Sequence, residues 1–168
     1  MDRNRTRDDV RFAERQTFPS WMGPALLVLA VPGPLLAIAA VVGEQGLTRN
    51  SLSLVAVVVA LTVAPLPLLL RSAMQTQVTD DGLQIQYWPF HRSPRAVPFD
   101  EIDDVRVESR RSYQYGIRWT RTGWEYTPNS RDGVAVTRQE QKPVFVGSDR
   151  PHELAMAIRE GLRAYRRR

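Results

Sequence analysis

The chain has 168 residues, a formal net charge of +5 and no cysteine. The lack of thiols excludes disulfides, thiolate metal sites and cysteine nucleophiles. Nearly all the positive charge is arginine, with Lys142 as the only lysine, and a basic balance of this kind suits nucleic acid, anionic lipid or no specific partner.

Residues 1–18 are polar and rich in arginine, with five arginines among the first fifteen positions. We predict a cytoplasmic tail that helps to fix the orientation of the chain in a membrane. The alternative is a short helix lying on anionic headgroups, because Val10, Ala13 and Thr17 recur at roughly helical spacing.

Two apolar stretches follow, at residues 21–43 and 51–70. Each is long enough to cross a bilayer as a helix, since spanning the hydrocarbon takes about 20 apolar residues. We therefore predict that residues 19–72 form a transmembrane hairpin of two helices. The prolines inside both stretches are expected to kink these helices, because neighbouring groups in a membrane protein satisfy the freed carbonyls.

Small residues recur at a spacing of four in both stretches, and such spacing lets helix backbones approach closely. The predicted helix-packing residues are Gly33, Ala37, Ala56, Ala60 and Ala64. Their expected partner is the other helix of the hairpin, and the alternative is a homodimer.

Charge sets the predicted orientation. The polar turn at residues 44–50 has Arg49 as its only basic residue, whereas arginines are plentiful before the first stretch and after the second. By the positive-inside rule, both termini lie in the cytoplasm of a multi-pass plasma membrane protein. Ala37-Ile38-Ala39 also resembles a signal-peptide cleavage site, but acidic residues dilute the charge of the leader. A cleaved chain would still keep the second span.

Residues 74–168 change to alternating apolar and polar positions, which is typical of half-buried strands. An Asp-Gly pair at Asp81–Gly82 predicts a β-hairpin. A second hairpin is predicted around Arg121–Thr122, with Trp119 opposite Trp124 and a second cross-strand pair between Ile117 and Tyr126. A single helical turn over residues 99–104 precedes a further strand at 105–108. Two more strands are expected at residues 134–137 and 143–146.

The last segment is predicted to be an amphipathic helix that contains Pro151 in its first turn. Leu154, Ile158, Leu162 and Tyr165 form its apolar face at helical spacing. Ser148 or Asp149 is expected to cap it.

This order resembles small bacterial and archaeal membrane proteins with two spans and a C-terminal pleckstrin-homology-like domain. The matching pieces cover most of the chain from Val78 to Ile158, and they are VTDDGLQIQY, VPFDEIDDVRVE, YGIRWTRTGWEY, DGVAVTR and PVFVGSDRPHELAMAI. The resemblance implies a membrane helical hairpin plus an α+β domain, in which about seven antiparallel strands form a half-open barrel capped by the last helix. It implies no particular activity, and fold alone cannot supply one.

Arginines interleaved with aromatic residues form the candidate site. The cluster consists of Arg106, Arg110, Arg111, Arg118 and Arg121, with Tyr113, Tyr115 and Trp119 between them. Basic side chains of a tethered domain are attracted to an anionic leaflet, so we predict contact with lipid headgroups or with a protein partner. The alternative is an ordinary charged outer face of a sheet. Such interleaving also suits nucleic acid, but membrane tethering argues against that partner.

No residue pattern indicates catalysis, a metal or a cofactor. His91 and His152 are far apart in sequence, and no nucleophile elbow or glycine-rich phosphate loop is present. The acidic run over residues 100–104 is interpreted as a solvated turn, with a cation site as its alternative. We predict a non-enzymatic integral membrane protein that presents a cytoplasmic pleckstrin-homology-like module for protein or lipid-headgroup interaction.

The alternative function is an accessory subunit of a transporter or membrane enzyme. It rests on the paired prolines of the two spans, which are Pro32, Pro34, Pro65 and Pro67. In this alternative the paired prolines form the surface that docks on the larger protein. Paired interruptions can also mark a transport site within the chain itself. Two spans without a charged residue inside make a poor substrate path of their own, however.

Overall fold

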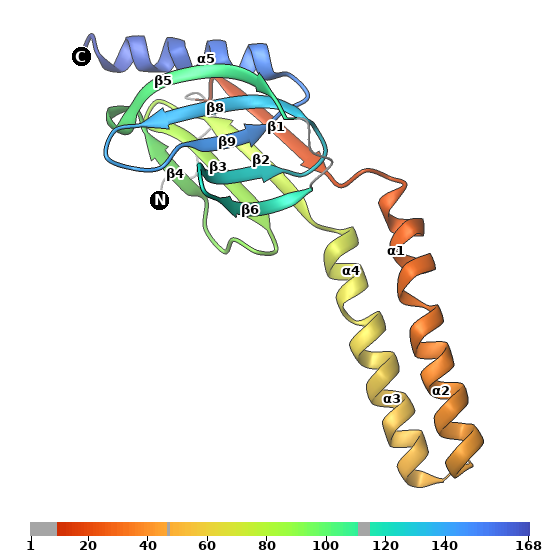
Figure 1. Cartoon of the computed structure of the whole chain (residues 1–168). Helices are drawn as coiled ribbons and strands as arrows, with labels where there is room; N and C mark the ends of the chain where they lie inside the picture. Colours follow the sequence, from red (N-terminus) through yellow and green to blue (C-terminus); the bar gives the residue numbers. More distant parts are fainter. Residues whose placement is uncertain (1–9, 47, 111–114) are drawn as a thin grey trace. The chain divides into compact units, whose positions relative to one another are not determined.

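The computed structural model describes residues 10–46, 48–110 and 115–168. The chain divides into two compact units (Figure 1). One unit joins the residues up to Phe18 with Ala73–Arg168, and it is called the β domain below. The other is Pro19–Ser72, called the helical hairpin. Each unit is described by itself.

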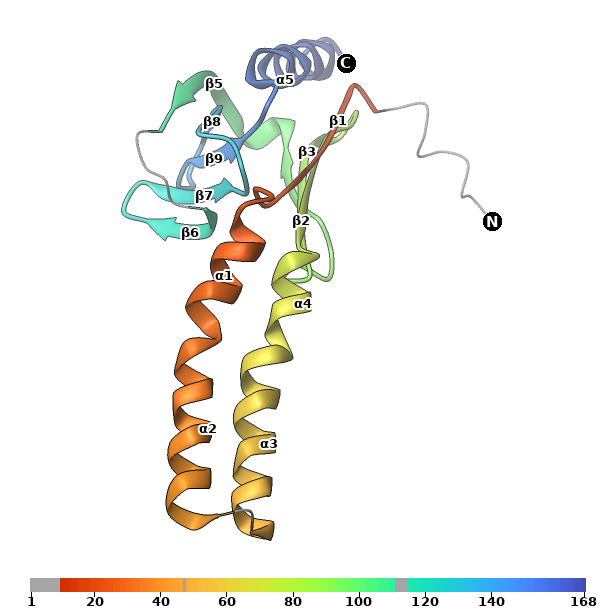
Figure 2. The same ribbon diagram turned by 90° about the vertical axis from the view of Figure 1, so that its right-hand side faces the viewer.

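The helical hairpin contains four helical segments in two antiparallel runs, with α2 and α3 side by side (Figure 2). The segments are α1 (Met22–Ala30), α2 (Pro32–Gln45), α3 (Arg49–Val63) and α4 (Pro65–Leu70). Val31 and Ala64, the residues between them, keep right-handed helical backbone angles. The prolines therefore interrupt the hydrogen-bond ladder, as their missing N–H requires, without ending either run. Met22–Glu44 and Arg49–Leu68 are long and apolar enough to cross a membrane, on length and composition alone.

Side chains close the tip of the hairpin. Thr48 precedes α3, and its backbone N–H donates to Ser51 Oγ at 2.8 Å, while the Ser51 N–H donates to Thr48 Oγ1 at 3.2 Å. This reciprocal pair satisfies N–H groups that a helix start leaves without partners. Ser51 Oγ also donates to the carbonyl of Gly46 at 2.6 Å and is fully buried. The turn is thus fixed by its own polar groups.

The β domain has two sheets and a long closing helix. Sheet A has the order β1-β2-β3-β4, and sheet B has the order β5-β8-β9-β7-β6. The strands of sheet A are β1 (Phe12–Thr17), β2 (Ala73–Val78), β3 (Gly82–Trp88) and β4 (Arg95–Pro98). Those of sheet B are β5 (Ile102–Ser109), β6 (Gly116–Thr120), β7 (Gly123–Thr127), β8 (Asp132–Arg138) and β9 (Val144–Gly147). A 3-10 turn, η1 (Phe99–Glu101), joins the sheets, and α5 (Pro151–Tyr165) follows the last strand.

Strand β1 differs from the sequence expectation, which placed residues 1–18 in a solvated tail. Phe12–Thr17 form an edge strand of sheet A and pair with β2 from Phe12↔Val78 to Thr17↔Ala73. The helical hairpin is therefore inserted between two neighbouring strands of one sheet. Only residues 18–21 and 71–72 separate those strands from the helices.

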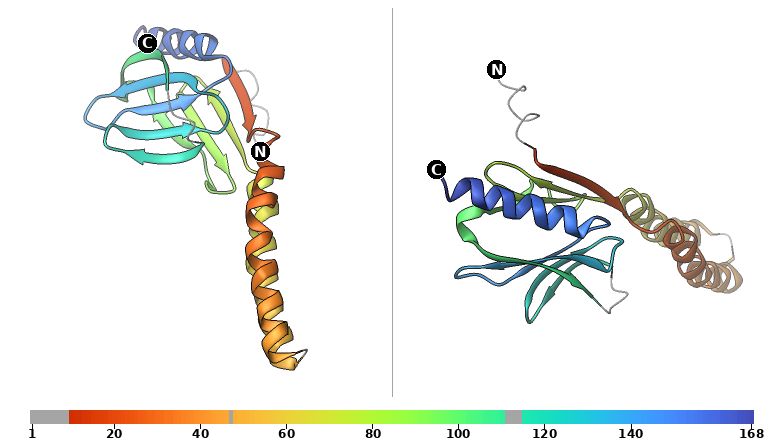
Figure 3. Two further views of the ribbon diagram at one scale, coloured as in Figure 1. Left: turned by 45° about the vertical axis from the view of Figure 1, so that its right-hand side comes forward. Right: turned by 90° about the horizontal axis from the view of Figure 1, so that it is seen from above.

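Helix α5 covers the space between the two sheets (Figure 3) and packs on strands of both. Leu154, Ile158 and Leu162 are buried, as their spacing predicts, whereas Tyr165 is 43% exposed. Gly161 lets α5 approach the ring of Phe99 closely, because a Cβ at this position would clash with that ring. Core residues from both sheets, such as Tyr87 and Val134, complete one hydrophobic core.

Both predicted β-hairpins are confirmed. Strands β2 and β3 pair around the Asp-Gly turn, and β6 and β7 place Trp119 opposite Trp124 with ring centroids 4.8 Å apart. Two features of the domain differ from an antiparallel barrel of about seven strands. The described residues form nine strands, and β9 runs parallel to β7.

The start of α5 also differs from expectation. Its N-cap residue is Arg150, which makes no side-chain cap, and neither Ser148 nor Asp149 fills that position. Ser148 Oγ does accept from the Arg150 N–H at 3.0 Å, and groups from β1 bind the remaining polar atoms at the helix start, as described below.

Candidate functional site

Three arginines of the predicted cluster, Arg106, Arg110 and Arg118, lie on the outer face of sheet B. Directly paired residues put their side chains on the same side of a sheet, so the strand registers define one row across it. The row, called the cross-sheet row below, runs Arg106, Ala135, Phe145, Glu125, Arg118. Two of the five predicted arginines belong to it.

Glu125 is the centre of this face. It is only 6% exposed, and a buried carboxylate is costly unless it is paired. Arg118 Nη2 donates to its Oε2 atom. Arg110 approaches from the end of β5, with Nε 3.9 Å from Glu125 Oε1 and Nη2 3.2 Å from Glu108 Oε2. One arginine on β6 and one directly after β5 thus compensate one buried charge.

Arg110 also covers an aromatic ring. Its guanidinium carbon lies 4.8 Å from the centroid of Phe145, a cation–π distance. Beneath the ring is Gly133, where a Cβ would approach Phe145 Cζ to 2.7 Å. Phe145 is therefore buried although it points away from the core. Arg110 thus contributes to packing on this face as well as to its ion pairs, because its guanidinium covers the Phe145 ring.

The charges of this face cancel. Arg106 pairs with Asp104 at 2.6 Å, and this hydrogen bond holds the pKa of Asp104 below its ordinary value. Together with the pairs around Glu125, three arginines face three acidic side chains, Asp104, Glu108 and Glu125. Among the described residues of this face, the three arginines are thus matched in number by three acidic side chains.

Of the other two predicted arginines, only Arg121 lies within the described residues. Arg121 is exposed in the β6–β7 turn, and no ion pair is found for it within the described part of the chain. Arg111 falls outside the described residues, as does Tyr113. The structure thus joins Arg106, Arg110 and Arg118 on one face and leaves Arg121 at the turn.

Two hollows accompany these polar groups. The first is lined in part by Arg110, Glu125 and Phe145 and has a volume of about 210 Å³. This volume is below the usual range of about 300–1,000 Å³ for ligand pockets. The second, of about 320 Å³, lies at the acidic run that includes Glu101. Glu101 accepts from Gln141 at 3.2 Å and lies 3.6 Å from Arg138. Among the described residues, no group of three or more His, Cys, Asp or Glu side chains could hold a metal ion.

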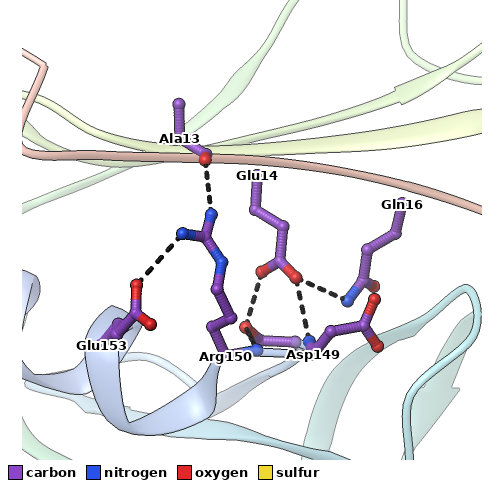
Figure 4. A network of polar contacts seen from close by, with 7 residues as sticks. Ala13, Glu14, Gln16, Asp149, Arg150 and Glu153 are labelled. Atoms are coloured by element: carbon purple, nitrogen blue, oxygen red, sulfur yellow. Dashed lines mark hydrogen bonds and ion pairs between the residues drawn. The ribbon is translucent and has the colours of Figure 1, made fainter.

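Sequence reasoning missed a polar network that joins β1 to the start of α5 (Figure 4). Glu14 lies on the inward side of β1, where its Oε2 accepts from Ser148 Oγ at 2.6 Å and its Oε1 accepts from the Asp149 N–H at 2.9 Å. Gln16, itself 3% exposed, donates to the same carboxylate at 3.1 Å. A negative charge at a helix N-terminus is favourable.

Arg150 forms the second half of this network. It donates to the carbonyl of Ala13 at 2.9 Å, pairs with Glu153 at 3.0 Å, and its guanidinium carbon lies 4.9 Å from the centroid of Phe12. Asp149 lies beside Glu14, and burial, followed by repulsion from that carboxylate, raises its pKa. The network links the strand that precedes the hairpin to the last helix of the chain.

The loop between β3 and β4 exposes large apolar side chains. Trp88 is 48% exposed and Phe90 is 56% exposed. Backbone hydrogen bonds hold the loop, since the His91 N–H donates to the carbonyl of Tyr87 at 2.8 Å. In return the Tyr87 N–H donates to His91 Nδ1 at 3.4 Å. Burial and the nearby charge of Arg95 lower the pKa of His91.

The predicted helix-packing residues do not lie between the helices. Gly33, Ala37, Ala56, Ala60 and Ala64 are all exposed in the hairpin, and no atom lies within 4 Å of a Cβ built on Gly33. The less exposed side chains are larger ones, among them Ile38 on α2 and Val55, Val58 and Thr62 on α3. The small residues thus lie on the exposed sides of the helices.

No protein-family model matches the chain, and a search of the curated proteins gave no match either.

Proposed function

We propose that the protein is an integral membrane protein whose helical hairpin holds the β domain at the cytoplasmic surface of the plasma membrane. The β domain acts there as a non-catalytic interaction module, and its partner is the lipid headgroup layer or another protein. Both termini lie in the cytoplasm, and the tip of the hairpin lies outside.

One observation carries this proposal, which is the insertion of two span-length helices between β1 and β2. A domain joined to a single helix by a long linker can move far from the bilayer. Here two links, residues 18–21 and 71–72, leave neighbouring strands of one sheet. Because a residue adds at most about 3.6 Å to an extended chain, the domain stays within a short distance of the bilayer on both links.

The β domain is proposed to be pleckstrin-homology-like. Two sheets that share one core and are closed by an amphipathic C-terminal helix support this family of folds. The additional N-terminal strand β1 and the parallel pair β7 and β9 are departures from its simple antiparallel order. The family would supply a scaffold, and the activity has to come from particular surfaces.

Cysteine labelling tests the topology, because the chain contains no cysteine of its own. Asn50→Cys lies at the hairpin tip and Asn129→Cys in an exposed turn of the β domain. In intact cells, a membrane-impermeant maleimide is expected to label position 50, and to label position 129 only after the membrane is permeabilised. Labelling of position 129 from outside would overturn the cytoplasmic module, and equal labelling of both would overturn the spanning hairpin.

A second candidate function, an accessory subunit of a transporter or membrane enzyme, is favoured by the exposed small residues Ala56, Ala60 and Ala64. Such residues allow close packing against a helix of another chain. Photo-crosslinking from position 60 in native membranes distinguishes the two. Capture of a single, larger membrane protein supports the accessory role, whereas capture of lipid or of a second copy counts against it.

A further inference from the structure

The β3–β4 loop, residues 89–94, follows Trp88 at the end of sheet A that is joined to the helical hairpin. Ala73 is the first residue of β2, and Trp88, the last residue of β3, is its direct partner in the sheet. Thr17, the last residue of β1, pairs with Ala73 on the other side. The three residues Thr17, Ala73 and Trp88 therefore form one row across sheet A. At this row the chain leaves β1 for the hairpin, returns from it into β2, and leaves β3 for the loop.

Chain geometry limits how far the loop lies from the apolar helices. Ala73 follows Leu70 by three residues, and consecutive Cα atoms are 3.80 Å apart, so the two Cα atoms lie within about 11 Å. Paired residues of antiparallel strands are about 5 Å apart. The Cα of Trp88 is therefore within about 17 Å of the end of the second apolar run. The polar layer of a bilayer is about 5–7 Å deep on each side.

The loop has the residue types that favour that layer. Trp88 and Phe90 are about half exposed, and Arg92 is exposed without an ion pair among the described residues. No acidic residue occurs between Gly82 and Phe99. Aromatic side chains concentrate at membrane–water interfaces, and arginine pairs with lipid phosphate.

This loop contrasts with the predicted arginine cluster. Arg106, Arg110 and Arg118 are compensated by acidic side chains of their own sheet. Arg92 has no such acid beside it in the described structure, and its loop is held in shape by the hydrogen bonds between Tyr87 and His91. The exposed rings are therefore presented by an ordered loop.

We propose that Trp88 and Phe90 enter the interfacial layer of the bilayer that the hairpin spans, and that Arg92 binds the phosphate groups of anionic lipids there. This inference rests on the proposed function, since it requires that the hairpin cross the membrane. In this inference the β3–β4 loop, and not the outer face of sheet B, is the lipid-facing surface of the β domain.

The test uses the full chain reconstituted into vesicles of phosphatidylcholine and phosphatidylglycerol. Ser93→Cys places an environment-sensitive fluorophore in the exposed part of the loop and leaves both aromatic side chains in place. Asp81→Cys is the matched control, because its turn is at the opposite end of β2 and β3, about 20 Å away along the sheet. Brominated lipid is then added as a quencher that acts only from within the bilayer.

We expect a blue-shifted spectrum and quenching at position 93, and neither at position 81. If Arg92 binds lipid phosphate, quenching at position 93 should increase with the fraction of phosphatidylglycerol, and Arg92→Gln in the Ser93→Cys background should abolish this increase. The double variant Trp88→Ser with Phe90→Ser should reduce quenching at position 93 to the level seen at position 81. Equal quenching at positions 93 and 81, or a water-exposed spectrum at position 93, overturns the inference and leaves a protein partner for this loop.

Labelling at Asn50→Cys in the same vesicles separates this result from the proposed function. If position 50 is protected from reagent on the side of the β domain, the hairpin spans the bilayer, and an unquenched loop overturns the loop inference alone. If position 50 and position 93 react from the same side, the spanning hairpin itself is wrong.

Discussion

Glu14 shows how one side chain joins parts of the chain that are far apart in sequence. It lies 134 positions from Ser148 and binds the Ser148 hydroxyl and the Asp149 N–H with its two oxygens. No local pattern marks such a residue, because a glutamate in an arginine-rich segment is typical of a solvated tail. Only the strand register, which turns Glu14 toward α5, identifies its role.

Glu14→Ala should destabilise the β domain by about 1–3 kcal/mol, since it leaves partly buried donors without an acceptor. Arg15→Ala is the matched control, because Arg15 is exposed on the other side of the same strand. The urea midpoint of the full chain in detergent micelles, followed by tryptophan fluorescence, measures both. Equal midpoints for the two variants would show that the network does not stabilise the domain.

His91 predicts a pH dependence at the β3–β4 loop. Burial, and then the charge of Arg95, lower its pKa in the folded state from the ordinary 6.5. As the pH falls below 6.5, the unfolded state therefore binds more protons at His91 than the folded state does. The contribution of neutral His91 to the free energy of unfolding is complete above pH 6.5 and is lost as the pH falls toward the lowered pKa of the folded state. Protonation of Nδ1 would also break its hydrogen bond from the Tyr87 N–H.

Hydrogen exchange of the loop at about pH 7.5 and about pH 5.5, corrected for intrinsic rates, should therefore show weaker protection at the lower pH. His91→Asn keeps an acceptor and removes the titration, so its protection should change less between the two values. An equal change in both proteins would assign the pH effect to another group.

At the scale of elements, the sequence predicts those strands whose partners are close in the chain. The β2–β3 and β6–β7 hairpins follow from their turn residues and from alternation, and both are confirmed. The register expected for β6 and β7 is confirmed as well, with Trp119 opposite Trp124. Strand β1 could not be predicted in this way. Its inward positions are Phe12, Glu14 and Gln16, so apolar and polar residues do not alternate, and its partner β2 lies beyond the entire helical hairpin.

The insertion predicts that the hairpin can be replaced by a turn. Substituting Asn-Gly for residues 18–72 would join Thr17 to Ala73, which are already paired, through a two-residue turn that suits antiparallel strands. We expect a soluble domain with cooperative thermal unfolding and a dispersed amide spectrum.

The matched control is a chain of residues 73–168, which lacks β1. It leaves the edge of β2 unpaired and removes the acceptor for Ser148 and Asp149. Because an open, unpaired edge promotes aggregation, we expect this chain to unfold at a lower temperature or to aggregate. The same unfolding temperature for both chains would show that β1 is dispensable.

At the scale of the whole molecule, the candidate site shows where sequence reasoning ends. The spacing of arginines identifies strands that carry positive charge, and three of the predicted residues do share one face. It does not identify the neighbours across the sheet. Glu125 reaches this face because β7 is placed between β9 and β6, and the order of non-consecutive strands is a property of the fold. The prediction of the helix-packing residues was limited in the same way, because the spacing of small residues does not determine which side of a helix faces its neighbour.

The separation of β1 from its partners also sets an order of events during synthesis. Glu14 leaves the ribosome 134 positions before Ser148, which at about 5–20 residues per second is a wait of roughly 7–27 s. Both apolar runs are translated in that interval, so under the proposed topology the hairpin enters the membrane before the sheet can close. We expect a chain whose hairpin fails to insert to leave β1 and β2 unpaired and to present an open strand edge, which would make it a target for chaperones and proteases. If the proposed function holds, membrane insertion thus comes before completion of the β domain.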